Sequence, residues 1–161
     1  RSMDVEKIEI NINISNVLSE VEQYILSDKN FVDQICLQGV NKFIDPYYGS
    51  RSMKEVDSEF TEYDFSVNLF PDMEYTNSLI GDLGIKRTRI MRMKPKTCLS
   101  YHYDRTWRVH VPLITNSKCF LLIDGTAYHV PADGAYKVNT TKYHTAINAS
   151  FEARTHLVGI L

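Results

Sequence analysis

Hydrophobic and polar residues alternate through much of the second half of the chain, from Arg87 to Leu161. A period of two is typical of strands that are buried on one face. Clusters of Pro, Gly, Asn and Asp interrupt the pattern and indicate turns. The predicted strands are 87–94, 98–104, 107–114, 118–124, 126–130, 134–140, 144–149 and 153–161. Asp124-Gly125 predicts a tight hairpin, and eight strands without an intervening helix predict a sandwich, barrel or jelly roll.

The first half of the chain has a mixed pattern. Residues 4–13 alternate and predict a strand, whereas Val17, Leu18, Val21 and Ile25 follow the period of an amphipathic helix. Ser15 is the expected N-cap of that helix, which should end at about Ser27 and pack outside the sheet. Residues 31–40 fit no single element, and 45–52 predict a loop.

Length and charge limit the class of protein. A chain of 161 residues is expected to form a single domain, 1–161, with its core strands in 87–161. The net charge of -2 argues against a general nucleic-acid binder, and no apolar run is long enough to predict a membrane span. Arg1-Ser2, before Met3, is expected to derive from a cloning vector and is excluded from the fold.

The cysteines indicate a compartment. Cys36, Cys98 and Cys119 are odd in number and form no C-x-x-C pair, so we expect small buried residues in a reducing environment. No secretory signal pattern is present. These observations predict an intracellular, cytoplasmic protein.

A candidate metal site lies in His102-Tyr103-Asp104 and the more distant His144. Alternate residues of a strand share a face, so His102 and Asp104 can aim at one point. A second imidazole completes two histidines and one carboxylate, the set that binds Fe(II) in non-haem oxygenases and leaves coordination positions open. The alternative is an aspartate that orients its neighbouring histidine, with His144 in the core.

Three further residues are candidates for binding carboxylates. Arg154 enters an apolar strand, where a buried cation needs an anionic partner such as 2-oxoglutarate. The alternative is a surface pair with Glu152. Arg108 and His110 share a face of the strand 107–114 and could hold a carboxylate of the cosubstrate or the substrate. Alternatively, they are an exposed cation and a core imidazole; His129 and His156 lie off the pattern and are expected to be structural.

Charged residues gather in two stretches: residues 55–74 are acidic and residues 86–96 are basic. They could be two solvated faces that partly pair with each other. Alternatively, the basic strand lines a groove for an anionic ligand. The second interpretation predicts a small-molecule or peptide substrate that bears an acid.

From Met93 to Leu161 the chain resembles the aspartyl/asparaginyl β-hydroxylase family of Fe(II)/2-oxoglutarate-dependent oxygenases. The matching elements are Met93-Lys94-Pro95, His102 with Asp104, the segment 108–113, Asp133-Gly134, His144, Asn148 and Arg154. The resemblance implies a mainly β fold, a double-stranded β-helix (a cupin-like jelly roll) with the N-terminal helix or helices outside. It also implies that Arg154 binds the distal carboxylate of 2-oxoglutarate, with Arg108 and His110 near its other end. Met91 replaces a family serine, so another donor must assist Arg154.

These observations predict a 2-oxoglutarate-dependent dioxygenase with His102, Asp104 and His144 as catalytic metal ligands. Its cofactors would be Fe(II), 2-oxoglutarate and O2. The reaction would hydroxylate an unactivated C–H bond of an acid-bearing amino acid or protein side chain and release succinate and CO2. One alternative is a cupin-like metalloenzyme without 2-oxoglutarate, although no glutamate lies between Glu74 and Glu152 to complete such a site. The other is a non-catalytic β-sandwich binding module.

Overall fold

The computed structural model describes residues 3–161, so the expected vector-derived Arg1-Ser2 lies outside the described residues. The strands are β1 (Val5–Lys7), β2 (Gln34–Cys36), β3 (Gln38–Gly39), β4 (Val67–Asn68), β5 (Lys86–Met93), β6 (Thr97–Cys98), β7 (Arg108–Ile114), β8 (Cys119–Ile123), β9 (Thr126–Tyr128), β10 (Tyr136–Val138), β11 (His144–Asn148) and β12 (Arg154–Ile160). The helices are α1 (Ile14–Val21), the π-helical turn η1 (Glu22–Leu26), the 3₁₀ turns η2 (Met53–Glu55) and η3 (Glu62–Asp64), and α2 (Glu74–Leu83).

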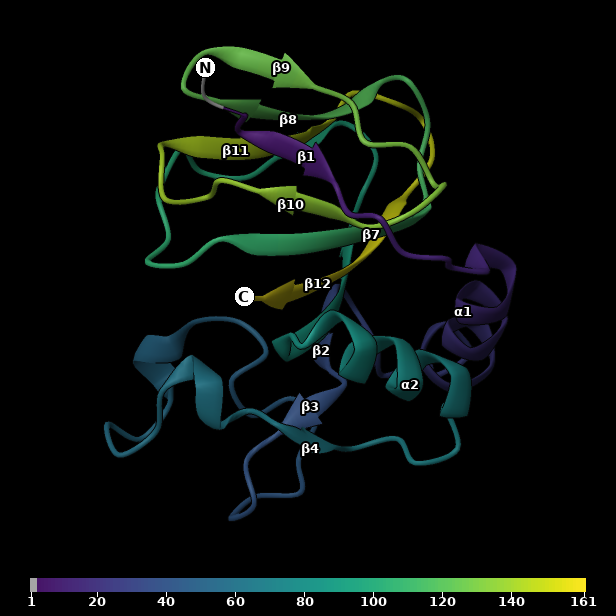
Figure 1. The fold of residues 1–161 in the computed structure, drawn as a ribbon, viewed down its shortest axis with the longest axis vertical. Helices are drawn as coiled ribbons and strands as arrows, with labels where there is room; N and C mark the ends of the chain where they lie inside the picture. Colours follow the sequence, from purple (N-terminus) through teal and green to yellow (C-terminus); the bar gives the residue numbers. More distant parts are fainter. Residues whose placement is uncertain (1–2) are drawn as a thin grey trace.

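Two antiparallel sheets form the barrel. The larger has the order β1-β10-β7-β12-β5-β2, and the smaller has the order β6-β11-β8-β9. In Figure 1, β8, β9 and β11 lie above β7 and β12, and both helices lie below them. Neighbouring strands of the larger sheet are far apart in sequence, as in a jelly roll. The predicted mainly β, double-stranded β-helix with outer helices is confirmed.

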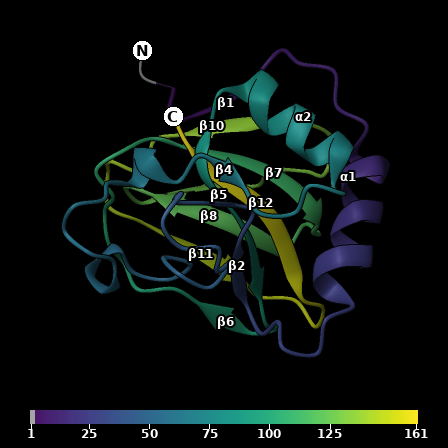
Figure 2. The same ribbon diagram turned by 90° about the horizontal axis from the view of Figure 1, so that it is seen from below.

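Strand β7 shows how the sequence divides the larger sheet into two faces. Val109, Val111 and Leu113 pack in the core that joins this sheet to the helices. Arg108 and His110 alternate with them and therefore face the interior, between the sheets. Figure 2 shows α1 and α2 together on one side of the larger sheet. Polar side chains can therefore line the barrel interior while the apolar core lies on the other face of the sheet.

Helix α1 begins two residues earlier than expected. Its N-cap is Asn13, whose side chain accepts a hydrogen bond from the backbone N–H of Asn16, so the prediction of Ser15 is wrong. The pattern did not predict α2. The Glu20 carboxylate accepts hydrogen bonds from the backbone N–H groups of Tyr75 and Thr76 at the start of α2. Gly84, with φ of 66°, ends that helix.

The later strands fall close to their predicted positions, with one exception. Residues 98–104 do not form a continuous strand: β6 ends at Cys98, and His102 makes only an isolated bridge to His144. The hairpin at Asp124 and Gly125 is confirmed, because both residues have the positive φ angles that its tight turn requires.

Two other expectations concern the chain as a whole. Cys36 and Cys119 are buried, but Cys98 is exposed, so only two of the three cysteines serve as small core residues. Among residues 3–161, no helix combines the length and apolar character needed to cross a membrane.

Candidate metal centre and cosubstrate pocket

The His102–His144 bridge positions the two candidate imidazoles. The backbone N–H of each residue donates to the carbonyl oxygen of the other, at 3.0 Å and 2.7 Å. Residues opposite each other in an antiparallel pair present their side chains on the same face. The ring centroids consequently lie 4.6 Å apart. The expected juxtaposition is present, but a bridge between distant segments creates it rather than a regular strand.

Both imidazoles are oriented in the same way. The Nδ1 atom of His102 lies 2.8 Å from the Ser100 carbonyl, and that of His144 lies 2.9 Å from the Lys142 carbonyl. A carbonyl oxygen only accepts, so each Nδ1 carries the proton and each Nε2 keeps a free lone pair. Metal-binding histidines are held by this kind of hydrogen bond.

Asp104 completes the cluster from a loop. Its backbone N–H donates to the Thr140 carbonyl at 2.8 Å, which fixes the loop beside β11. Its carboxylate oxygens lie 3.7 Å from His102 Nε2 and 3.4 Å from His144 Nε2. These three are the only group of three or more potential ligands found within residues 3–161, with their ligand atoms all within 4.8 Å of one another.

The chemistry of this cluster fits a divalent first-row metal. An octahedral ion with nitrogen and oxygen ligands at about 2.1 Å holds adjacent ligand atoms roughly 3 Å apart. Burial by itself raises the pKa of Asp104, but the adjacent His144 imidazole and the charge of Arg108 outweigh it and hold this pKa at about 2. The carboxylate is therefore anionic at neutral pH. His102 is 40% exposed, so the site is open on one side.

Arg108 lies beside the metal cluster and is already paired. Its Nε is 3.4 Å from Asp104, and its Nη1 donates to Glu62 at 2.9 Å. Glu62 also accepts from Arg87 at 2.8 Å. The acidic stretch therefore does pair with the basic stretch, through Glu62. Sequence reasoning missed Glu62, because no local pattern distinguishes it from its acidic neighbours.

Arg154 is buried in the barrel, and its side chain has no partner among the residues that the structure describes. It is 3% exposed. Leu157 packs in the core between the larger sheet and the helices, and Arg154 lies on the opposite face of the same strand, so it faces the barrel interior. Within residues 3–161 its side chain makes no hydrogen bond or ion pair, and its Nε is fully buried. Burial lowers the pKa of Arg154 to about 10, which leaves it cationic at neutral pH. The alternative interpretation, a surface pair with Glu152, is not found among residues 3–161, and the arrangement suits an anionic ligand.

His110 connects the region of Arg154 with the metal cluster. Its Nδ1 lies 3.0 Å from Nδ1 of His156, a residue that the pattern assigned to structure alone. Burial and then the charges of Arg154, Arg108 and His144 lower the pKa of His110 to about 3. Burial lowers the pKa of His156 well below its ordinary value. The available signal for His156 was its position two residues after Arg154, which puts both on one face.

The buried His110–His156 pair predicts acid sensitivity of the metal-free protein. Both folded-state pKa values lie below the unfolded value of about 6.5, so only the unfolded chain takes up these protons as pH falls. Stability should be highest above pH 6.5 and decline toward the folded pKa values, by up to about 1.4 kcal/mol per pH unit for each imidazole. Urea unfolding at pH 7.5, 6.5 and 5.5 measures this slope. Equal stability at the three pH values would contradict the buried neutral pair.

A further buried cation lies on β5. Arg89 Nη1 donates to the Ser50 carbonyl and to the Gln34 side chain, but its buried Nε has no partner among the described residues. Burial and the charges of Arg87 and Arg108 lower the pKa of Arg89 to about 9. The basic strand therefore contributes buried cations and is not simply a solvated face.

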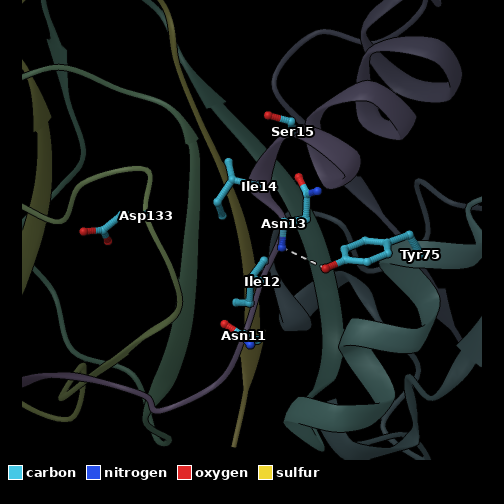
Figure 3. A pocket seen from close by; sticks show the side chains of 7 residues that line it. All are labelled: Asn11, Ile12, Asn13, Ile14, Ser15, Tyr75 and Asp133. Carbon is cyan, nitrogen blue, oxygen red and sulfur yellow. Dashed lines mark hydrogen bonds between the residues drawn. The ribbon is translucent and has the colours of Figure 1, made fainter.

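A surface hollow lies away from the metal cluster. It has a volume of about 540 Å³ and is lined by residues 11–15, Tyr75 and Asp133 (Figure 3). The backbone N–H of Asn13 donates to the Tyr75 hydroxyl across it, at 2.8 Å. None of its lining residues belongs to the histidine–aspartate cluster, so it does not carry the candidate chemistry.

Comparison with protein families identifies the chain. The model of the aspartyl/asparaginyl β-hydroxylase family matches residues 64–159, more than half of the 161 residues. The chain belongs to this family. The match begins well before Met93, where the sequence motifs begin, and it includes α2 and every residue of the cluster. Membership of the aspartyl/asparaginyl β-hydroxylase family points to a hydroxylase of the 2-oxoglutarate/Fe(II) oxygenase type.

Solved structures with similar folds support the jelly roll. A viral collagen prolyl hydroxylase from Paramecium bursaria Chlorella virus-1 has a TM-score of 0.53 at 9% identity, with coverage of 99% of this chain and 97% of that one. A 2OG-Fe(II) oxygenase family oxidoreductase from Burkholderia pseudomallei has 0.52 at 16%, covering 96% and 91%. A prolyl-4-hydroxylase from Pseudomonas putida has 0.50 at 10%, covering 99% and 88%. The comparison with curated proteins gave no match.

Proposed function

We propose that this chain is an Fe(II)- and 2-oxoglutarate-dependent dioxygenase that hydroxylates an unactivated C–H bond of an acid-bearing substrate. The observation that carries the proposal is the convergence of His102 Nε2, His144 Nε2 and the Asp104 carboxylate on one point. Arg154, whose side chain has no partner in the described part of the chain, lies in the same barrel and supports a dianionic keto acid as the cosubstrate. Family membership supports the same class of reaction.

The residues divide the work between them. His102, Asp104 and His144 would hold Fe(II), and Arg154 would hold 2-oxoglutarate by its distal carboxylate. Bound Fe(II), 2-oxoglutarate and O2 supply the oxidation: one oxygen atom becomes the substrate hydroxyl, the other enters succinate, and CO2 leaves. The buried walls around His110 and Arg154 exclude water from the keto acid, while the exposed side at His102 admits the substrate.

Buried cations support an acid-bearing substrate. Arg87, Arg89 and Arg108 lie near two carboxylates, those of Glu62 and Asp104, and Asp104 would be shared with the metal. Nη2 of Arg108 has no hydrogen bond within residues 3–161, so this guanidinium can accept an additional anion while it holds Asp104. A free amino acid or a peptide side chain with a carboxylate fits this charge balance.

Succinate release from 2-oxoglutarate tests the proposal. We expect Fe(II)-dependent succinate formation that rises when an aspartate- or glutamate-bearing amino acid or peptide is added, and rises less with the matching amides. Zn(II) in place of Fe(II) is the control and should support no turnover, because Zn(II) has no redox chemistry. Metal binding without any 2-oxoglutarate consumption would favour a cupin-like metalloenzyme instead. Equal stimulation by acids and amides would contradict the proposal that the substrate bears an acid.

A further inference from the structure

Two buried nitrogen atoms on the inner face of β12 lack hydrogen-bond partners among residues 3–161. They are Nε of Arg154 and Nε2 of His156, in residues that are 3% and 2% exposed. The two residues are separated by one position of the same strand, so their side chains share a face. Each therefore presents an unfilled hydrogen-bonding position to the same part of the barrel interior.

The residues opposite them on the neighbouring strands provide no hydrogen-bonding group for these two nitrogens. Arg154 lies opposite Met93 on β5, and His156 lies opposite Met91 on β5 and Pro112 on β7. None of these three side chains donates a hydrogen bond, and a thioether accepts only weakly. An imidazole is a costly residue in such surroundings, because a buried polar atom without a partner is destabilising. A ligand that reaches this end of the barrel would remove that cost.

The His110–His156 contact limits what the ligand can be. Of the two Nδ1 atoms, 3.0 Å apart, one must donate and the other must accept. If His110 donates, the neutral His156 ring carries its remaining proton on Nε2 and becomes a donor toward the interior. A carboxylate has only acceptor atoms, so it selects this tautomer, and the adjacent Arg154 supplies the opposite charge.

We propose that His156 Nε2–H and the Arg154 guanidinium together bind the distal carboxylate of 2-oxoglutarate, while His110 acts as a positioning residue that fixes the His156 tautomer. This inference rests on the proposed function. It supplies the second donor beside Arg154 that Met91 cannot provide. It also changes the role of His110, whose Nδ1 proton then goes to His156 rather than to the keto acid.

Calorimetric titration of the Mn(II)-loaded protein tests the proposal without turnover. The ligands are 2-oxoglutarate and 2-oxopentanoate, which has the same chain length but ends in a methyl group. We expect His156→Leu to weaken 2-oxoglutarate binding by about tenfold to a hundredfold, the usual effect of losing one hydrogen bond to a charged group. Binding of 2-oxopentanoate should change by less than about twofold, and His156→Gln, which keeps an N–H donor, should recover part of the loss.

The outcomes separate the two proposals. Wild-type protein that binds no keto acid would overturn the proposed function and this inference with it. Wild-type protein that binds 2-oxoglutarate, with His156→Leu equally tight or weakened equally for both keto acids, would overturn only the role of His156.

A measurement on the wild-type protein tests the proposal even if the His156 variants fail to fold. In ¹⁵N-histidine spectra, the His156 Nε2–H signal should shift when 2-oxoglutarate is added and remain in place with 2-oxopentanoate. No shift with 2-oxoglutarate, at a concentration where calorimetry shows saturation, would overturn the proposal.

Discussion

His144→Ala will abolish Fe(II)-dependent turnover of 2-oxoglutarate and leave the protein folded. We expect metal affinity to fall by more than about a hundredfold, because changing even an outer partner of a metal ligand costs about 10–100-fold. The fold should survive, since the imidazole makes one hydrogen bond within its own segment, to the Lys142 carbonyl. Loss of that bond costs about 1 kcal/mol. Anaerobic Fe(II) titration, succinate release and thermal unfolding measure the three quantities.

A second histidine provides the matched control for this experiment. His129 is exposed, and its Nδ1 contacts the Cys119 carbonyl, outside the metal cluster. His129→Gln should therefore keep wild-type metal affinity and turnover. If His144→Ala binds Fe(II) as tightly as this control, the metal centre lies elsewhere and the oxygenase proposal fails.

The barrel could be predicted because its signals are local. Period-two patterns give β7 and β12 nearly to the residue, and Asp124-Gly125 gives a hairpin, because these features depend on neighbours in the sequence. The alternation of side chains along a strand also placed Arg108 and His110 on one face. The same rule, applied to β12, would have placed His156 beside Arg154. His156 was assigned to structure only because it lay outside the expected family motif.

Features that depend on distant partners could not be predicted. Residues 98–104 alternate like a strand, yet only His102 pairs, because its partner His144 lies in β11 and Asp104 bonds instead to Thr140. Helix α2 is capped by a side chain from α1, Glu20, more than fifty residues earlier. The selection of Glu62 as the partner of Arg87 and Arg108 likewise depends on tertiary packing. Single-sequence patterns contain no information about such pairs.

Removing Arg154 should separate cosubstrate binding from metal binding. In Arg154→Ala, a buried carboxylate would lose its cationic partner, which costs about 2–5 kcal/mol, or roughly 30-fold to several thousand-fold in 2-oxoglutarate affinity. Arg154→Lys should lose less, because it keeps the charge but not the planar pair of donors. Metal affinity should remain at the wild-type value in both variants, since Arg154 is not a ligand. Titration of 2-oxoglutarate and of Mn(II) into each variant measures both effects.

The stability of the unliganded protein provides an independent test of the same residue. Arg154 is a buried cation without a partner among residues 3–161 and lies opposite Met93, so Arg154→Met should stabilise the protein by about 1–3 kcal/mol while it removes 2-oxoglutarate binding. Addition of 2-oxoglutarate should then raise the unfolding temperature of the wild-type protein and leave that of Arg154→Met unchanged. A stabilising substitution that destroys ligand binding identifies a residue retained for function. Equal 2-oxoglutarate affinities in wild type, Arg154→Met and Arg154→Ala would mean that this arginine does not bind the cosubstrate.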